Sequence, residues 1–207
     1  GHSFGTSWDA ITDDESFIQA ASNEYTVPIE RTRGTVVIES QGNPQAVQKN
    51  ASNGWSYGLM QIVPFGKGWP GWHRKIASIG KIPYDRSDPK YSAAIVEALL
   101  DPRINLLVGA SILRDLYDQY GSWDAASSRF FTGSSSTWVG ADTVNGTLGG
   151  DYKHSLDGLI AEQKGITPPV VIDPVALIYG GKHPTIIDFQ NKTGHQINQG
   201  LKATNAA

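Results

Sequence analysis

The chain has 207 residues, a formal net charge of −3 and only 18% charged residues, which excludes a highly charged disordered chain. Its near balance of acidic and basic residues argues against a nucleic-acid-binding protein, because such proteins are usually clearly basic. It has no cysteine, so disulfides, thiol nucleophiles and cysteine-ligated zinc are excluded.

The N-terminal part of the sequence predicts two helices. Over residues 13–25 the apolar residues follow helical spacing, after two aspartates that suit a helix start. Pro28 fits the first turn of a second helix that runs to about Ser40. The β-branched stretch Thr35–Ile38 suits a strand equally well, and the pattern alone does not decide between the two.

Two segments farther along the chain lack periodicity. Residues 41–56 are rich in Gly, Asn, Ser and Gln, with turn signals at Asn43-Pro44 and Asn53-Gly54, and they predict a loop, or a loop with a short turn of helix. Residues 63–90 intersperse Pro and Gly with aromatic side chains and predict a long irregular excursion. Long irregular loops of compact domains are often functional.

The clearest helix of the sequence covers about residues 101–120. Asp101-Pro102 is a start signal and Gly121 a stop signal, and apolar residues lie three and four apart between them. Shorter helices are predicted over residues 90–100, 123–131 and 151–163.

The character of the sequence changes near Gly165, where Thr167-Pro168-Pro169 opens a segment with few helix signals. We therefore expect one domain over 10–165 and an extended tail or linker over 166–207. No apolar run approaches the roughly 20 residues that span a bilayer, so no membrane span is expected. Residues 1–5 lack the features of a signal peptide, which suggests a mature form or a piece of a larger protein.

Glu39 is the first candidate catalytic residue. It follows the apolar run Val36–Ile38, so its carboxyl group is expected to lie against a nonpolar wall. Desolvation raises the pKa of a carboxyl group, and a general acid that works near neutral pH needs a raised pKa. Ser40 is placed to orient the carboxyl group. A solvated glutamate at a helix end fits the position as well, because most glutamates lie on the surface.

The segment Gly58–Gln61 combines a flexible glycine, two apolar side chains and an amide. A sugar-binding site needs this mixture, because apolar groups contact the ring faces and amides bind hydroxyl and N-acetyl groups. Gln61 is the candidate for these hydrogen bonds, with Met60 packing beneath it and Tyr57 lining the cleft. A buried apolar turn explains the same segment equally well.

Together the two segments resemble the motifs of lytic transglycosylases, the lysozyme-like enzymes that cleave peptidoglycan. The first motif corresponds to Glu39–Ala46 and the second to Gly58–Pro64. The resemblance extends more loosely to the helix over 103–120 and covers about residues 20–160. It implies a mostly α, lysozyme-like fold (α+β with minimal β) with long irregular loops and an extended C-terminal arm.

The third family motif, Ala-Tyr-Asn-x-Gly, is altered in this chain. Phe130 and Phe131 stand where the family has Tyr and Asn, so the hydroxyl and the amide of that motif are both replaced. Phe130 keeps an aromatic ring for sugar contact. An arginine close to the catalytic glutamate would lower its pKa and oppose the acid role. The replacement donor is expected to be one of three residues: Arg129, Thr132 or Tyr152.

The resemblance implies cleavage of the β-1,4 bond between N-acetylmuramic acid and N-acetylglucosamine. Glu39 would donate a proton to the bridging oxygen and then remove one from the C6 hydroxyl of the muramoyl residue, which leaves a 1,6-anhydro end. No metal and no cofactor are expected. Substrate contacts are expected from Ser40, Tyr57, Met60, Gln61, Phe130 and Tyr152.

Two other functions fit the same residues. An aspartate that reached across the cleft would activate water and make a muramidase-type hydrolase, with Asp85, Asp88 and Asp101 as candidates. Turn and cap roles account for these aspartates as well. In the second alternative, the altered third motif marks a weakly active peptidoglycan-binding module.

The altered motif is also similar to that of wall-degrading domains in phage tail proteins. The expected place of action is therefore a virion tail, as part of a larger tail polypeptide, or the bacterial cell envelope. In both settings the expected partner is the glycan strand of peptidoglycan, and no nucleic-acid partner is expected.

Overall fold

The computed structural model describes residues 5–50, 54–66, 71–132, 143–144, 147–165 and 197–199. These ranges form a mostly helical domain with a small antiparallel sheet, as predicted. A short 3-10 helix at Thr12–Asp14 leads into α2. The α-helices are α1 (Gly5–Ala10), α2 (Glu15–Tyr25), α3 (Ile29–Ser40), α4 (His73–Gly80), α5 (Tyr91–Leu100), α6 (Pro102–Tyr120), α7 (Trp123–Thr132) and α8 (Gly149–Gln163).

The ambiguous stretch Thr35–Ile38 belongs to helix α3. Pro28 precedes its first residue, and Gln41 ends it in a left-handed conformation with φ 52°. Every residue from Gly34 to Ser40 is buried, because α2 and α8 pack around this helix. A run buried on every side suits a central helix as well as a central strand, so the packing of the neighbouring helices decides what local preference leaves open.

The prediction of a loop over residues 41–56 was wrong in part, because this segment contains a β-hairpin. Ala46–Asn50 (β1) and Gly54–Tyr57 (β2) are antiparallel. The strands lacked the usual alternation because β1 buries the polar Gln48 beside Val47. The register pairs Val47 with Tyr57, Gln48 with Ser56, Lys49 with Trp55 and Asn50 with Gly54.

The predicted excursion over 63–90 also contains a helix, α4. Its buried residues His73, Ile76 and Ala77 have helical spacing, and the helix packs against α5 and α6. The surrounding Gly and Pro residues obscured this pattern, since α4 is only 8 residues long. It ends at Lys81, which takes a left-handed conformation with φ 56°.

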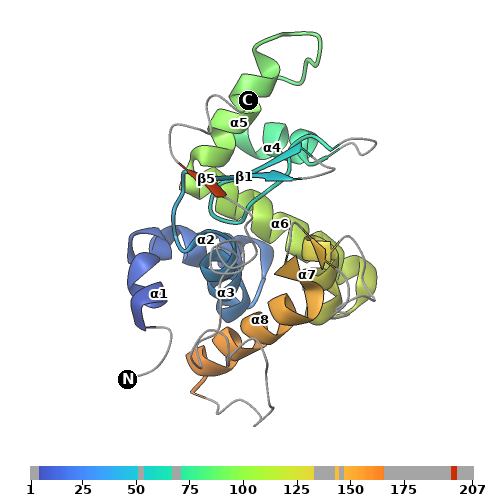
Figure 1. Ribbon diagram of the computed structural model, residues 1–207. Helices are drawn as coiled ribbons and strands as arrows, with labels where there is room; N and C mark the ends of the chain where they lie inside the picture. The colour runs from blue at the N-terminus through green and yellow to red at the C-terminus, as the bar shows by residue number, and fades with distance from the viewer. Residues whose placement is uncertain are drawn as a thin grey trace.

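Helix α6 is the centre of the fold. The side chain of Asp101 caps its start by accepting from the backbone N–H of Arg103 over 2.8 Å, and Gly121 ends it with φ 80°, both as predicted. The helix packs against α2, α4, α5 and α7. In Figure 1, the hairpin, α4 and α5 lie on one side of α6, and α1, α2, α3 and α8 lie on the other.

Most of the predicted tail over 166–207 lies outside the described residues, so the domain boundary near residue 165 stays a prediction. Of the tail, Ile197–Gln199 (β5) pairs with β1 as an antiparallel strand. Thr143–Val144 (β3) and Thr147–Leu148 (β4) form a separate two-stranded ribbon before α8. Within the described ranges, no helix has both the length and the apolar character needed to cross a membrane.

Candidate active site

Glu39 lies in the last turn of α3 and is 6% exposed. The apolar residues Val36–Ile38 before it are fully buried. Burial raises the pKa of the Glu39 carboxyl group from its ordinary 4.5 to about 8. The C-terminal end of a helix carries partial negative charge, which disfavours the carboxylate further. The carboxyl group therefore keeps its proton at neutral pH, as a general acid must.

Tyr152 of α8 is the polar partner of this carboxyl group. Its hydroxyl donates a hydrogen bond to Oε2 of Glu39 over 3.2 Å. This bond favours the carboxylate and lowers the pKa of Glu39, but the effect of burial is larger. Burial and the neighbouring carboxyl group raise the pKa of Tyr152 well above 10, so the phenol stays protonated and remains a donor.

Of the three expected replacement donors, Tyr152 is hydrogen-bonded to Glu39. The side chain of Thr132 lies outside the described part of the chain. The altered third motif contributes differently, through Phe131 in the last turn of α7. The ring of Phe131 lies parallel to the ring of Tyr152, with 3.9 Å between the centroids and 14° between the planes.

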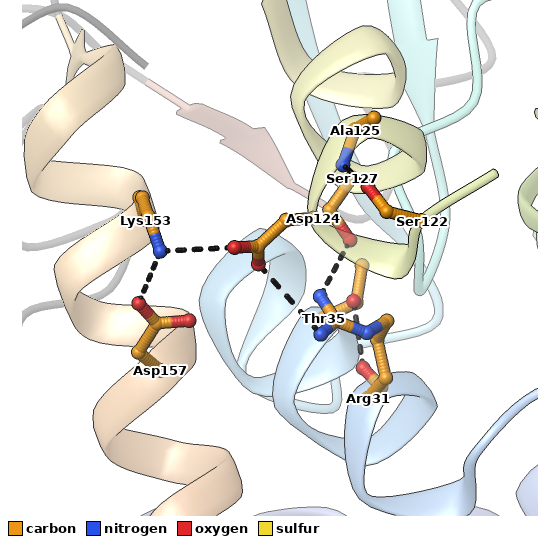
Figure 2. Close-up of polar contacts among 8 residues, drawn as sticks. All are labelled: Arg31, Thr35, Ser122, Asp124, Ala125, Ser127, Lys153 and Asp157. Atoms are coloured by element: carbon orange, nitrogen blue, oxygen red, sulfur yellow. Dashed lines mark hydrogen bonds and ion pairs between the residues drawn. The ribbon is translucent and has the colours of Figure 1, made fainter. Parts of the chain in front are cut away.

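A chain of polar contacts joins α3, α7 and α8 (Figure 2). Arg31 of α3 donates to Oγ of Ser127 over 2.9 Å and lies 3.9 Å from the carboxylate of Asp124, both on α7. Lys153 of α8 donates to Asp124 over 3.3 Å and to Asp157 over 2.5 Å. Burial lowers the pKa of the Arg31 guanidinium, and the charges of the two aspartates oppose this.

This network is close in sequence to both members of the catalytic pair. Arg31 lies about two helical turns before Glu39 on α3, and Lys153 directly follows Tyr152 on α8. The contacts therefore hold together the two helices that carry the carboxyl group and its donor.

The hydroxyl of Ser40 is bonded within the end of α3. It donates to the carbonyl oxygen of Val36 over 3.1 Å and accepts from the backbone N–H of Gly42 over 3.2 Å. These bonds stabilise the end of the helix directly after Glu39. The expected role of Ser40 in orienting the carboxyl group stays a prediction.

The segment Gly58–Gln61 forms a tight turn, and the side chain of Asn105 on α6 is hydrogen-bonded to its backbone. The Asn105 side chain accepts from the backbone N–H of Met60 over 2.8 Å and donates to the carbonyl oxygen of Tyr57 over 2.9 Å. Gly58 has φ 78°, and a Cβ there would lie 2.2 Å from Nδ2 of Asn105. Glycine is therefore required at this position by both conformation and space.

The side chains of this turn point into the domain. Met60 is fully buried against Gly109, and Tyr57 is 3% exposed, with its pKa raised by burial to about 12. Nε2 of Gln61 donates to the carbonyl oxygens of Ala46 and Gly58 over 3.0 and 2.9 Å. Tyr57, Met60 and Gln61 therefore shape the turn from within, and their contacts with substrate stay predictions.

Comparison with known families decides the assignment. The sequence model of the transglycosylase SLT domain matches residues 16–139, which is more than half of the chain. The chain belongs to the transglycosylase SLT domain family. This confirms the resemblance and the lysozyme-like fold that the motifs predict. No curated protein and no solved structure matched the chain.

Membership defines the substrate class of this SLT domain. Such domains act on peptidoglycan, outside the cytoplasm. The matched range contains Glu39, the Gly58–Pro64 motif and the altered Phe130-Phe131 pair. It ends before Tyr152, so the structure and not the family match locates the donor to Glu39.

The aspartates considered as second carboxylates of the SLT domain have the turn and cap roles that the sequence predicts. Oδ1 of Asp85 accepts from the backbone N–H of Ser87 over 3.0 Å, and Oδ1 of Asp88 accepts from that of Lys90 over 2.9 Å. Asp101 caps α6. Within the part of the chain that the structure describes, no three His, Asp or Glu side chains gather to form a metal site.

Two contributions to the site were missed in the sequence. Phe131 was read only as the loss of an amide, whereas its ring packs on Tyr152. Arg31 gave no signal, because its partners follow about 95 residues later in the chain. Asn105 and Gly109, by contrast, belong to the part of the helix over 103–120 to which the resemblance extends; they lie one turn apart on α6, and both contact the Gly58–Gln61 turn.

Proposed function

We propose that this SLT domain is a lytic transglycosylase that cleaves the β-1,4 bond between N-acetylmuramic acid and N-acetylglucosamine, with Glu39 as its general acid and base. The observation that supports this most is the state of Glu39: a buried carboxyl group with a pKa of about 8 and one tyrosine hydroxyl as its hydrogen-bond partner. Such a group is protonated at neutral pH and keeps a defined orientation.

The proposed reaction has two proton transfers through the same carboxyl group. Glu39 first gives its proton to the bridging oxygen as the bond from that oxygen to C1 of the muramoyl residue breaks. The resulting carboxylate then takes the proton of the C6 hydroxyl while the C6 oxygen forms a bond to C1. The products are a 1,6-anhydro muramoyl end and a free hydroxyl on the other sugar, and no water is consumed.

Tyr152 has a role in the second transfer. Its hydroxyl donates to the side chain of Glu39, and this hydrogen bond is strongest when the acceptor is a carboxylate. The ionised form that arises between the two transfers is therefore stabilised among apolar residues. Nucleophile and reacting carbon belong to one sugar residue, so proximity replaces a second catalytic carboxylate.

A hydrolase of the muramidase type is not favoured. It needs a second carboxylate that activates water or attacks C1. The carboxylates of Asp85, Asp88 and Asp101 are each bonded to the backbone of their own turn or helix start.

We propose that Phe130, whose ring is half-buried, contributes a sugar contact.

The test is Glu39→Gln assayed on purified peptidoglycan, with Glu97→Gln as the matched control at an exposed position. We expect the first variant to lose activity by about 10²- to 10⁴-fold, the usual contribution of a general acid, and the control to keep it. Both are expected to remain folded. Full activity of Glu39→Gln would show that another group is the acid.

Mass spectrometry of the digest in heavy-oxygen water separates the two reactions. A lytic transglycosylase yields anhydro ends without the label, whereas a hydrolase yields labelled reducing ends. The setting, a phage tail polypeptide or a bacterial envelope enzyme, stays a prediction from the altered third motif.

A further inference from the structure

The hydrogen bond of 3.2 Å from Tyr152 to Glu39 depends on the rotamer of the tyrosine side chain. A change of the χ1 rotamer moves the hydroxyl of a tyrosine away from its acceptor, so packing that restricts the ring helps to keep the hydroxyl at Glu39. The ring of Phe131 provides such a surface, because the two rings lie within 14° of parallel at a centroid distance of 3.9 Å. Tyr152 is 1% exposed, so this contact lies in the interior of the domain.

Helix α7 holds Phe131 in place. Ser127 lies one helical turn before Phe131 and therefore on the same face of α7. Arg31 of α3 donates to Ser127 over 2.9 Å (Figure 2). At the start of the helix, Oγ of Ser122 accepts from the backbone N–H of Ala125 over 3.0 Å. The bond from Arg31 thus ties the face of α7 that carries Phe131 to α3, the helix of Glu39. The bond to Ser122 stabilises the start of α7.

We propose that Phe131 is a positioning residue for the reaction: its ring holds the ring of Tyr152 so that the phenol hydroxyl points at Oε2 of Glu39. The inference rests on the proposed function, since it concerns the donor to the proposed acid. The altered third motif of this chain then supports the glutamate through ring packing, in place of the polar side chains of the family motif.

The simpler explanation is that Phe131 only fills space between α7 and α8. A space-filling role predicts lower stability on truncation, with no change in the pH dependence of catalysis. A positioning role predicts that loss of the ring has the same kind of effect as loss of the Tyr152 hydroxyl. The two roles are therefore distinguished by the pH dependence of catalysis, which only the positioning role changes.

The test compares Phe131→Leu, Tyr152→Phe and the double variant on purified peptidoglycan. Leucine keeps apolar bulk but removes the stacked ring. We expect kcat to fall about three- to tenfold with KM unchanged, the factor that a ring pair contributes. The alkaline limb of the kcat/KM profile is expected to move to higher pH, as in Tyr152→Phe.

The double variant is expected to match Tyr152→Phe alone, because Phe131 acts through that hydroxyl. Phe131→Tyr keeps the ring and is expected to retain the wild-type kcat. Losses that multiply in the double variant would overturn the inference, since they would show that Phe131 acts independently of Tyr152.

The charged groups near Tyr152 are the same in all these variants. Among the described residues, the charge of Arg31 on α3 acts on Tyr152, and Asp124 on α7 and Lys153 and Asp157 on α8 interact with Arg31 or with one another. Their influence on the pH profile therefore cancels when a variant is compared with the wild type.

Trp123→Leu is the matched control for loss of a stacked ring. Trp123 lies at the opposite end of α7 from Phe131 and stacks on Tyr117 with 4.1 Å between centroids and 24° between planes. We expect this variant to lose stability but to keep the wild-type pH profile. A shifted profile in Trp123→Leu would mean that loosening α7 anywhere has this effect, and the specific role of Phe131 would be refuted.

Carbon NMR of the glutamate carboxyl groups gives a measurement that needs no turnover, with Glu39→Gln used to assign the Glu39 signal. We expect the titration midpoint of Glu39 to rise in Phe131→Leu toward its value in Tyr152→Phe. An unchanged midpoint overturns the inference. A raised midpoint supports it, and if Glu39→Gln is active at the same time, the proposed function fails instead. Phe131→Met repeats the test if the leucine variant does not fold.

Discussion

At the scale of single residues, Glu39 must satisfy two opposing demands. Donation requires a proton at neutral pH, which burial secures by raising the pKa to about 8. Proton removal requires an ionised carboxylate in the same apolar place, which the hydroxyl of Tyr152 stabilises. The burial and this hydrogen bond together set the free-energy difference between the protonated and the ionised form of Glu39.

Tyr152→Phe is expected to shift this balance toward the protonated form. Without its donor the carboxylate loses stabilisation, so the pKa of Glu39 rises above about 8. We expect kcat to fall by about 10- to 100-fold, the factor for a hydrogen bond to a charged group, and the alkaline limb of kcat/KM to move to higher pH. Steady-state kinetics across the pH range measures both.

The control for this variant is Tyr91→Phe. Its hydroxyl is also buried and hydrogen-bonded, to Nδ1 of His73 over 2.9 Å, but on the other side of the fold. We expect Tyr91→Phe to change stability alone. A Tyr152→Phe enzyme with wild-type kcat and an unshifted limb would contradict the role given to this tyrosine.

How far the sequence predicts the site depends on sequence distance. Glu39 is identifiable because the apolar run that buries it is adjacent in the chain. Tyr152 follows 113 residues later, and only the packing of α8 on α3 brings it to the carboxyl group. A composition of apolar groups and an amide at Gly58–Gln61 indicated a site, but it could not show that Gln61 turns its amide inward.

At the scale of elements, helices approach closely where glycine removes a side chain. On α3, a Cβ at Gly34 would lie 3.0 Å from Leu156 of α8, and this close approach brings Tyr152 within reach of Glu39. On α6, a Cβ at Gly109 would lie 2.2 Å from Sδ of Met60. Both glycines therefore set distances between elements that define the site.

Gly109→Ala tests this packing with opposing expectations. Helix propensity alone predicts a gain of about 1 kcal/mol for alanine in a helix interior. The contact with Met60 predicts a loss, because the fully buried side chain of Met60 must shift, and overpacking costs about 1–3 kcal/mol. We expect the loss to dominate, with a lower free energy of unfolding in urea and reduced activity.

The matched substitution is Gly80→Ala in α4, where the nearest side-chain atom would lie at an ordinary contact distance of 3.5 Å. We expect it to be neutral or to stabilise by up to about 1 kcal/mol. Equal effects at positions 80 and 109 would mean that Met60 yields freely and that Gly109 does not fix the turn.

Elements with their own start and stop signals were predictable, and those that depend on partners were not. Helix α6 has its cap, its apolar stripe and its terminal glycine in the sequence. The β-hairpin lacks alternation, because Gln48 is buried beside apolar neighbours. The strands form because they pair with each other, and the turn after them is held by Asn105.

At the scale of the whole molecule, the buried acids make stability depend on pH. Burial raises the pKa of Glu39 to about 8, and burial with the charge of Asp13 raises that of Asp14 to about 6. Unfolding returns each group to a pKa near 4, so the unfolded chain releases these protons at lower pH than the folded one. Their stabilising contribution is complete below about pH 4 and is lost as the pH rises through 6 and then 8.

His73 has the opposite effect on stability, because burial lowers its pKa. Stability therefore rises with pH until the histidine of the unfolded chain has lost its proton, near pH 6.5. Between pH 6.5 and 8, Glu39 is therefore the main source of pH dependence among the buried groups of the described ranges. We expect the free energy of unfolding in urea to fall across this interval by an amount on the order of 1–2 kcal/mol.

Glu39→Gln is expected to flatten the curve and to be more stable than the wild type at pH 8, whereas Asp14→Asn flattens only the part below about pH 6. Glu97→Gln, at an exposed position, is expected to follow the wild type. A wild-type curve that rises from pH 6.5 to 8, or a Glu39→Gln curve parallel to it, would show that the proton of Glu39 is not held by burial.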